Sequence, residues 1–448
     1  MPSPGAFLER VFALSSRGTT VRREVLGGLT TFMTMSYIVF VNPAILGAAG
    51  MPRGGVMLAT CLGAAFATIL MGLLANLPVA LAPGMGMNAF VAYVICGQMG
   101  YSWRTALGMV FWSGVVFLAL SVVRLRETLI AAIPKGLKLG AAAGIGLFIA
   151  FIGLQHAGIV VDGSPGTLVK LGSLAERPVL VALFGIALTS ALMALRVRGS
   201  VLLGLVATGL VALAAGLLPW GRSETSGSGG TLLALDIAGA LAPAAWPAIL
   251  TLLFFDMFDT VGTLMGVAEE AGLLDEQGRV PGAGRALASD AAGTVAGALL
   301  GTSTVTSYIE SAAGVAAGAR TGLSNLVVAG LFLVSVPMLP LVGVLGNAVA
   351  WKGALLYPVT APALVVVGFL MAGAMRKIDW DDVTEGLPAF LTVLVMPLTF
   401  SISAGLAAGF VSCSLLKLVT GRASGVHPLV HVVSGCIVVG YVAVHLAS

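Results

Sequence analysis

Charged residues are scarce in this sequence of 448 residues. Only 9% are Asp, Glu, Lys or Arg, whereas soluble globular proteins have about 25%. Hydrophobic residues make up 58%, and uncharged runs such as 25–52 and 321–351 are long enough to cross a hydrocarbon core of about 30 Å as helices. This composition excludes a soluble globular enzyme and predicts an all-α polytopic membrane protein embedded in a lipid bilayer.

Cysteines and nucleotide-binding motifs are scarce too. The four cysteines lie in apolar sequence with neither a Cys-x-x-Cys pair nor a Cys/His cluster, so we expect no metal centre and no bound cofactor. No Gly-Lys dipeptide occurs, which excludes a Walker A phosphate loop and argues against ATP-driven pumping by this chain. The net charge is +4, but the basic residues are dispersed through short connections, so they indicate membrane topology rather than a nucleic-acid partner.

Apolar runs, separated by charges and by Gly or Pro, predict fourteen membrane spans in two groups of seven. We assign 20–220 to a first seven-span repeat and 245–420 to a second, inverted one, on either side of the polar stretch 221–230. The segment 426–447 is an extra C-terminal hydrophobic element, either a further span or a helix at the membrane interface. The predicted spans are 25–47, 56–77, 80–98, 104–123, 138–158, 179–195, 201–220, 245–268, 285–300, 302–319, 324–346, 355–375, 387–399 and 401–418.

Lys and Arg gather on alternate connections, which sets the orientation of the spans. Several arginines precede the first span, and that span is too long for the core of a cleaved signal peptide. We read 387–418 as two short spans because Pro397 interrupts it,. The chain is therefore predicted to be a multi-pass protein of the cell (inner) membrane, with a cytoplasmic N-terminus and no cleaved leader.

Two spans at corresponding positions of the two halves are poor continuous helices. The third contains the Pro/Gly-rich run 82–88, and the tenth contains the Thr/Ser-rich run 301–310. Pro and Gly disfavour regular helix, whereas Thr and Val favour extended chain. Each span is therefore predicted to hold a short extended stretch followed by a half-helix, and substrate sites of inverted-repeat transporters lie at such paired breaks.

Three acidic residues lie inside otherwise apolar spans. Asp256 and Asp259 share one face of the eighth span at i, i+3 spacing, and Glu310 follows the Thr/Ser run of the tenth. Each ionised group costs roughly 2.5–3.5 kcal/mol at the centre of a membrane helix, and Lys and Arg lie only at the ends of spans, where they do not neutralise these acids. We infer that the three acids converge on one cavity; helix capping is the alternative role for either aspartate.

Two further side chains lie beside the breaks. Asn88, in the third span, offers donor and acceptor groups to a ligand, or simply tolerates the unusual backbone there. Phe255, next to the aspartates, can stack on a planar ligand or pack in the core.

In combination, these motifs resemble the AzgA-like purine permease branch of the nucleobase-cation symporter 2 (nucleobase/ascorbate transporter) family. The resemblance covers almost the whole chain. The matching segments are 30–38 with Asn42 and Pro43, 82–90, 255–263, 301–303 and 306–311.

The resemblance implies a permease that imports adenine, guanine or hypoxanthine by proton symport with alternating access. It also implies a core domain of spans 1–4 and 8–11, a gate domain of spans 5–7 and 12–14, and a possible homodimer. By motif match, Glu310 is the main base-binding acid, and Gly86 and Asn88 are the third-span pair. The substrate-binding candidates are Glu310, Asp256, Asn88, Gly86, Ser307, Thr306 and Phe255, and the proton-coupling candidates are Asp259, Asp256 and Glu310.

The chemistry of a purine agrees with this assignment. The base is flat and uncharged at neutral pH, and a carboxylate that accepts from its N–H groups makes a charge-assisted contact. A proton on one acid relieves its repulsion with neighbouring acids, which offers a way to couple proton and base. The sequence leaves open which purine is preferred, which acid carries the proton, and whether the ion is a proton or sodium.

Other classes of membrane protein fit the same residues less well. An anion transporter of the same architecture would need Lys, Arg or bare helix dipoles, whereas three acids repel anions. A cation channel could use acidic rings, but the paired breaks favour alternating access. An intramembrane protease would need its aspartates on separate helices.

Overall fold

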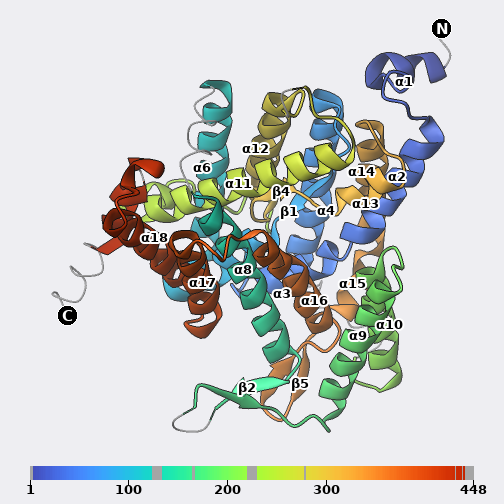
Figure 1. The fold of residues 1–448 in the computed structure, drawn as a ribbon. Coiled ribbons are helices and arrows are strands. Elements are labelled where there is room, and N and C mark those ends of the chain that lie inside the picture. Colours follow the sequence, from blue (N-terminus) through green and yellow to red (C-terminus); the bar gives the residue numbers. More distant parts are fainter. Residues whose placement is uncertain are drawn as a thin grey trace. The chain divides into compact units, whose positions relative to one another are not determined.

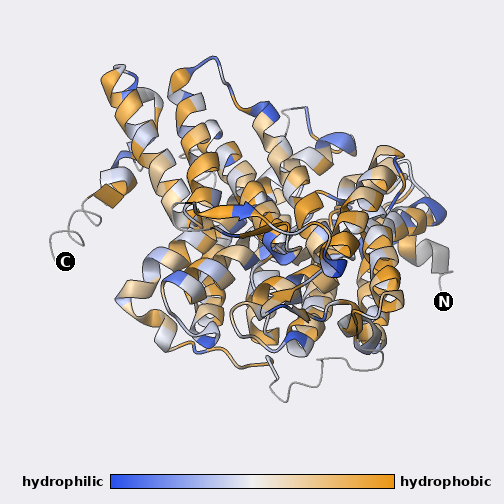
Figure 2. Cartoon of the chain, turned by 90° about the horizontal axis from the view of Figure 1, so that it is seen from below, coloured by the Kyte–Doolittle hydropathy of each residue, from blue (hydrophilic) through white to orange (hydrophobic). Residues whose placement is uncertain are grey.

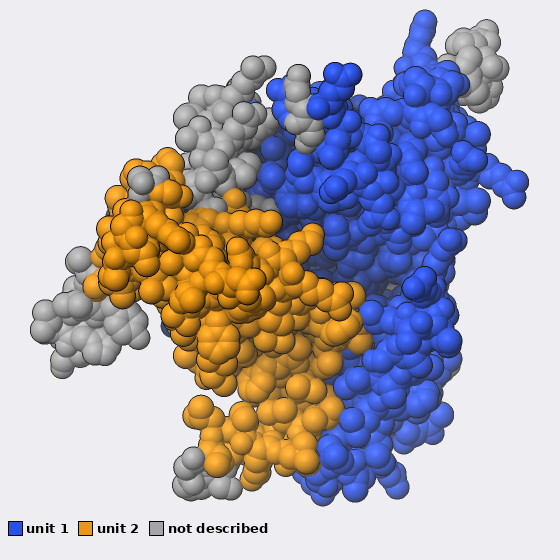
Figure 3. Space-filling model, viewed as in Figure 1, with its two compact units in different colours: residues 1–123, 173–363 blue, residues 124–172, 364–448 orange. Residues whose placement is uncertain are grey.

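The computed structural model describes residues 4–123, 134–163, 167–218, 230–276, 279–428, 430–435 and 437–438. The chain forms two compact units (Figure 3). Unit 1 comprises Met1–Val123 and Ser173–Ala363, and unit 2 comprises Arg124–Gly172 and Leu364–Ser448. Both consist of helices with short two-stranded sheets (Figure 1).

Unit 1 holds both predicted breaks and all the predicted site residues. Helices α9 and α10, which correspond to the sixth and seventh predicted spans, also belong to it. Its elements are α1 (Pro4–Phe12), α2 (Val21–Met35), α3 (Ile38–Gly47), α4 (Arg53–Leu70), η1 (Met71–Ala75), β1 (Leu81–Pro83), α5 (Met85–Ala89), η2 (Phe90–Gln98), α6 (Trp103–Val123), α9 (Arg177–Ala194), α10 (Ser200–Ala214), η4 (Gly239–Leu241), η5 (Pro243–Ala245), α11 (Trp246–Glu270), α12 (Ala283–Leu300), β4 (Val305–Ser307), α13 (Ser311–Ala316), α14 (Leu323–Ser335), η6 (Val336–Met338), α15 (Leu339–Leu345), β5 (Val349–Trp351) and β6 (Ala354–Leu356).

Unit 2 packs its helices through small residues. A Cβ built on Gly140 of α8 would lie 2.9 Å from the Cα of Ala389 in α17, and one on Gly409 of α18 would lie 2.0 Å from Thr392 Oγ1 in α17. Glycine is therefore required where these backbones approach. The elements are α8 (Lys135–His156), β2 (Val160–Asp162), β3 (Val169–Leu171), most of α16 (Ala361–Ala372), η7 (Gly373–Lys377), α17 (Val383–Leu398), α18 (Ile402–Val419) and η8 (Ala423–Gly425).

Apolar residues run along most of the helices (Figure 2). Each predicted span overlaps a helix or half-helix; how many of them cross a bilayer stays a prediction. Among the described residues, the segments that are long and apolar enough to span a membrane are Val21–Gly47, Arg53–Ala75, Trp103–Ser121, Lys135–His156, Arg177–Ala194 and Pro243–Glu270.

A strand lies in each of the two predicted breaks, and the two strands pair. β1 and β4 are antiparallel, with Leu81 opposite Ser307 and Pro83 opposite Val305. The pairing extends beyond the strands, because the Gly84 N–H donates to the Thr304 carbonyl at 2.9 Å. Unpaired backbone groups are costly in a membrane interior, and this ladder pairs them where the helices are interrupted.

The first and second halves of the chain also pack through helix α2. Glu24 in its first turn is fully buried, and its carboxylate accepts the backbone N–H groups of Arg320 at 2.8 Å and Ser324 at 3.2 Å. A Cβ on Gly28 would lie 2.5 Å from the Ser324 carbonyl oxygen. The close approach of α2 to the start of α14 thus depends on a buried carboxylate and a glycine.

The segment at 387–418 is two helices, α17 and α18, as the sequence predicts. Pro397 lies in the last turn of α17, and the break follows at Phe400, whose φ is +54°. The extra C-terminal segment begins against α18, where Ser434 Oγ donates to the Phe410 carbonyl at 2.8 Å. Residues 439–447 and most of the polar stretch 221–230 lie outside the described residues.

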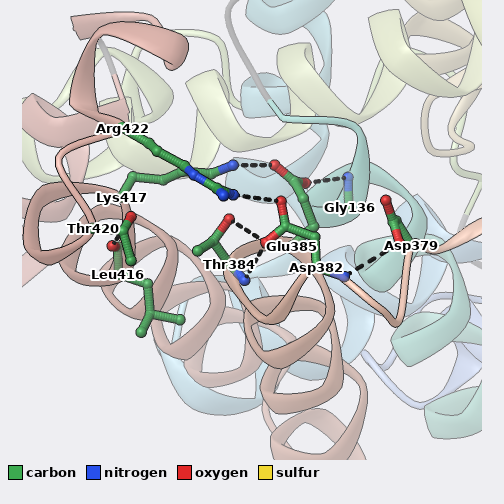
Figure 4. Close-up of polar contacts among 9 residues, drawn as sticks. All are labelled: Gly136, Asp379, Asp382, Thr384, Glu385, Leu416, Lys417, Thr420 and Arg422. Carbon is green, nitrogen blue, oxygen red and sulfur yellow. Dashed lines mark hydrogen bonds and ion pairs between the residues drawn. The ribbon is translucent and has the colours of Figure 1, made fainter.

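One end of unit 2 carries a cluster of charged side chains (Figure 4). Lys417 of α18 pairs with Glu385 of α17 at 2.8 Å, and the other Glu385 oxygen accepts the Gly136 N–H at the start of α8 at 3.1 Å. Asp382 caps α17 by accepting the Thr384 N–H at 2.9 Å. Hydrogen bonds from Thr384 hold the pKa of Asp382 below its ordinary value, so this cap is charged at neutral pH,.

We expect Glu385→Gln to destabilise the protein. The substitution leaves Lys417 ionised with only 10% of its side chain exposed, and breaking such a pair costs up to roughly 3–5 kcal/mol when it is fully buried. The melting temperature of the purified protein in detergent should fall by several degrees. Glu176→Gln, which breaks a pair with the exposed Lys352, is the matched control and should change it little. Equal melting temperatures for the two variants would show that the Glu385 pair does not hold unit 2 together.

Candidate substrate and coupling site

The candidate site is built around the β1–β4 ladder in unit 1. Helices α11 and α12 both contact β4, and α13 begins four residues after β4 ends. These elements place four carboxyl groups near the ladder: those of Asp256 and Asp259 on α11, Asp290 on α12, and Glu310 immediately before α13.

Glu310 is half-buried where the chain enters α13. The Tyr37 hydroxyl, at the break between α2 and α3, donates to Glu310 Oε1 at 2.6 Å. Thr34 Oγ1 donates to the Glu310 carbonyl at 3.4 Å. The orientation of this acid is therefore set by the first predicted span, 273 residues away in sequence for Tyr37.

The two aspartates of α11 lie in different surroundings. Asp256 is 1% exposed; Thr294 Oγ1 of α12 donates to its Oδ2 at 2.9 Å, and its Oδ1 has no hydrogen-bond partner among the described residues. Asp259 is exposed, and Thr306 Oγ1 of β4 donates to its Oδ2 at 3.4 Å. One acid of the pair thus lies in the protein interior and the other is accessible from outside it.

Asp290 is a fourth acid of the site that the sequence analysis missed. It lies within the predicted span 285–300 but was not among the candidate residues; it is completely buried in α12, which begins at Ala283. Thr260 Oγ1 donates to its Oδ1 at 2.7 Å, and its Oδ2 has no partner among the described residues. The sequence feature that could have revealed Asp290 is a single acid within a run of small and apolar residues.

The third-span pair is buried beside the ladder. Asn88 Oδ1 accepts a hydrogen bond from Ser303 Oγ, which joins the two breaks, and its Nδ2 has no partner among the described residues. Gly86 is buried two residues earlier, also in α5. Phe255 packs edge-to-face on Phe90 with the ring centroids 6.1 Å apart. The amide NH2 group of Asn88 is therefore without a partner among the described residues, while its oxygen joins the two breaks.

The two candidates in β4 point toward α11 and α12. Thr306 Oγ1 lies 2.8 Å from Thr260 Oγ1, and Ser307 Oγ donates to Asp290 Oδ1 at 3.5 Å. Their hydroxyls therefore belong to the hydrogen-bond network of the acids, and any contact with substrate would be made from within that network.

The four carboxyl groups also interact through their charges. Asp256 interacts with Asp290 and with Asp259, and Asp259 interacts with Glu310. The hydrogen bonds described for these acids come from Tyr, Thr and Ser hydroxyls rather than from Lys or Arg. Such a site suits a ligand with N–H donors, a cation or protons, and it disfavours an anion.

Comparison with known proteins places the chain among transporters. Residues 22–408 match the model of the Permease family (Xan_ur_permease). The chain is 49% identical over 431 residues to the putative permease MJ0326 of Methanocaldococcus jannaschii, covering 96% of each protein. It is 42% identical to the adenine permease AdeP of Escherichia coli, covering 95% of this chain and 94% of that protein. It is 43% identical to the guanine/hypoxanthine permease PbuG of Bacillus subtilis, covering 95% of this chain and 97% of that protein.

Solved structures show the same fold at low sequence identity. The transmembrane domain of the cyanobacterial bicarbonate transporter BicA aligns with a TM-score of 0.63 at 16% identity, covering 87% of this chain and 97% of that one. Family match, relatives and fold agree: the chain is a multi-pass membrane transporter, not an enzyme, and it belongs to the Permease family of nucleobase/ascorbate transporters.

Proposed function

We propose that the protein is a secondary active transporter that imports purine nucleobases by proton symport with alternating access. The observation that carries this proposal is the set of carboxyl groups around the β1–β4 ladder, hydrogen-bonded by hydroxyls and with Asp259 accessible. The names of the relatives, which include an adenine permease and a guanine/hypoxanthine permease, support adenine, guanine or hypoxanthine as the substrate.

In this proposal the purine binds through its edge and one face. Glu310 accepts N–H groups of the base, since a carboxylate has about four acceptor sites and the Tyr37 hydroxyl occupies only one of them,. The free amide donor of Asn88 serves a ring nitrogen or the O6 of hypoxanthine or guanine. Phe255, held by Phe90, packs against the ring,. Gly86, Asp256, Thr306 and Ser307 complete the proposed site.

The coupling ion is a proton that enters at the acids, and no other cofactor takes part. Asp259, Asp256 and Glu310 repel one another when ionised, so one proton among them lowers the cost of bringing a base into the site,. The protein with base and proton bound can then change between its outward-open and inward-open states.

The proposed architecture follows the two repeats. Residues 20–220 and 245–420 form inverted seven-span repeats, and spans 1–4 and 8–11 form a core that moves against a gate of spans 5–7 and 12–14. The exposed apolar residues of α2, such as Leu26, Leu29 and Met33, recur on one face of the helix and fit a lipid-facing position,. We place the protein in the cell (inner) membrane with a cytoplasmic N-terminus, and a homodimer is the proposed assembly.

An anion transporter is the main alternative because solved neighbours of this fold include a bicarbonate transporter. At 16% identity that likeness describes the fold alone, and the acids argue against an anion in the site. A cation channel would let hypoxanthine equilibrate, whereas a symporter accumulates it. Uptake of labelled hypoxanthine into proteoliposomes under an imposed pH gradient separates these classes.

We expect Glu310→Gln to weaken hypoxanthine binding by roughly 10- to 100-fold, because a hydrogen bond to a charged partner contributes about 1.5–3 kcal/mol. Equilibrium binding of labelled hypoxanthine to the purified protein at neutral pH measures this. Glu176→Gln, which makes the same change at an acid of unit 1 outside the proposed site and paired with the exposed Lys352, serves as the control. Unchanged affinity in Glu310→Gln would remove this acid from base recognition.

We expect Asp259→Asn to uncouple uptake from the proton gradient, because the amide cannot take up and release a proton. Accumulation of labelled hypoxanthine in proteoliposomes should become the same with and without an inward proton gradient. If the variant still concentrates hypoxanthine as the wild type does, Asp259 has no part in coupling.

A further inference from the structure

Two threonine hydroxyls connect the accessible acid of the site to the buried one. Thr260 Oγ1 on α11 lies 2.7 Å from Asp290 Oδ1 and 2.8 Å from Thr306 Oγ1 on β4. Thr306 Oγ1 in turn lies 3.4 Å from Asp259 Oδ2. The result is a continuous line of oxygen atoms from Asp259, which is exposed, to Asp290, which is completely buried.

The orientation of Thr306 is fixed by its neighbours. Its methyl group faces Gly84, where an added Cβ would lie 2.7 Å from Thr306 Cγ2. Its backbone is held in the ladder opposite Ala82. The hydroxyl is therefore directed to α11, where it meets both Thr260 and Asp259.

The inner end of this line is an acid with unused hydrogen-bonding capacity. Asp290 Oδ2 and the Oδ1 of its neighbour Asp256 both lack a partner among the described residues, although both side chains are at most 1% exposed. Among the described residues, the titratable groups that interact with these acids or with Asp259 are carboxyl and phenol groups, none of them cationic. They are Asp256, Asp259 and Asp290 themselves, Glu310 and Tyr308; Tyr37 in turn interacts with Glu310 and Tyr308.

We propose that Thr260 and Thr306 relay the coupling proton between Asp259 and Asp290, so that Asp290 stores this proton while the loaded transporter crosses the membrane. This inference rests on the proton symport proposed above. It assigns to Asp290 a role separate from base binding and makes Thr260 the positioning residue that connects it to the accessible acid.

The transfer conserves atoms and charge. Protonated Asp259 donates to Thr306 Oγ1, Thr306 donates to Thr260 Oγ1, and Thr260 donates to ionised Asp290. Each proton then moves one oxygen along, so three O–H bonds break and three form. Asp259 is left ionised and accepts from Thr306, while Asp290 is protonated. The reverse sequence returns the proton when the site opens to the other side.

The relay predicts a specific defect in Thr260→Val, which keeps the shape of the side chain and removes its hydroxyl. Exchange of labelled for unlabelled hypoxanthine at equal pH needs only the loaded form to cross, so it should continue. Gradient-driven accumulation requires the proton to be released in each cycle and should fall by roughly tenfold or more. The ratio of protons to hypoxanthine taken up, measured with a trapped pH dye, should fall with it. Thr260→Ser, which retains a hydroxyl, should restore both.

Thr208→Val in α10 is the matched control. Among the described residues, its buried hydroxyl donates to the Gly204 carbonyl of its own helix at 2.6 Å, so removing it should leave exchange, accumulation and the proton ratio at wild-type levels. Asp290→Asn is the second test of the relay and should reproduce the accumulation defect of Thr260→Val.

The outcomes separate the relay from the transport function. If the wild type exchanges hypoxanthine but never accumulates it, proton symport itself is wrong. If the wild type accumulates and Thr260→Val does so equally, with the same proton ratio, the relay is overturned and symport stands. Loss of exchange together with accumulation in Thr260→Val also overturns the relay, because the hydroxyl would then support the structure of the site rather than proton movement.

Discussion

The pairing of β1 with β4 is the constraint on which the structure of the site depends. Two interrupted helices in an apolar protein leave backbone N–H and C=O groups that lipid cannot satisfy, and each unpaired group costs several kcal/mol. The ladder pairs these groups across more than 200 residues of sequence, with Leu81 opposite Ser307. Because the ladder fixes both chain segments, it also fixes where α5 and α13 begin and where their polar side chains lie.

The acids around this ladder are held by hydroxyl groups rather than by cations. An ionised carboxylate in such a place is costly unless it is paired, and Tyr37, Thr260 and Thr294 supply only neutral donors. This arrangement leaves the charge of the cluster free to be balanced by a proton or by a base with N–H donors. A structural ion pair would already be balanced and would have no reason to respond to substrate.

The cluster in unit 2 shows the contrasting use of buried charge. There Glu385 meets Lys417 and the Gly136 N–H, so its charge is balanced by fixed partners. Three helices are joined at that point, and nothing about the arrangement calls for a ligand. The structural use of charge in unit 2 thus contrasts with the functional use that we propose for the acids of unit 1.

Local sequence was enough to predict the membrane class from composition, the two breaks from short-range backbone preference, and the family from the resemblance of its motifs. It also singled out Asp256, Asp259 and Glu310 as candidate site residues. It did not reveal that β1 pairs with β4, that Tyr37 orients Glu310, or that Asn88 is joined to Ser303. Asp290 was overlooked because one acid in a run of small residues has no distinct local pattern. These features depend on contacts between residues up to 273 positions apart in the sequence. Such contacts form only when the helices pack, so no short stretch of the chain determines them.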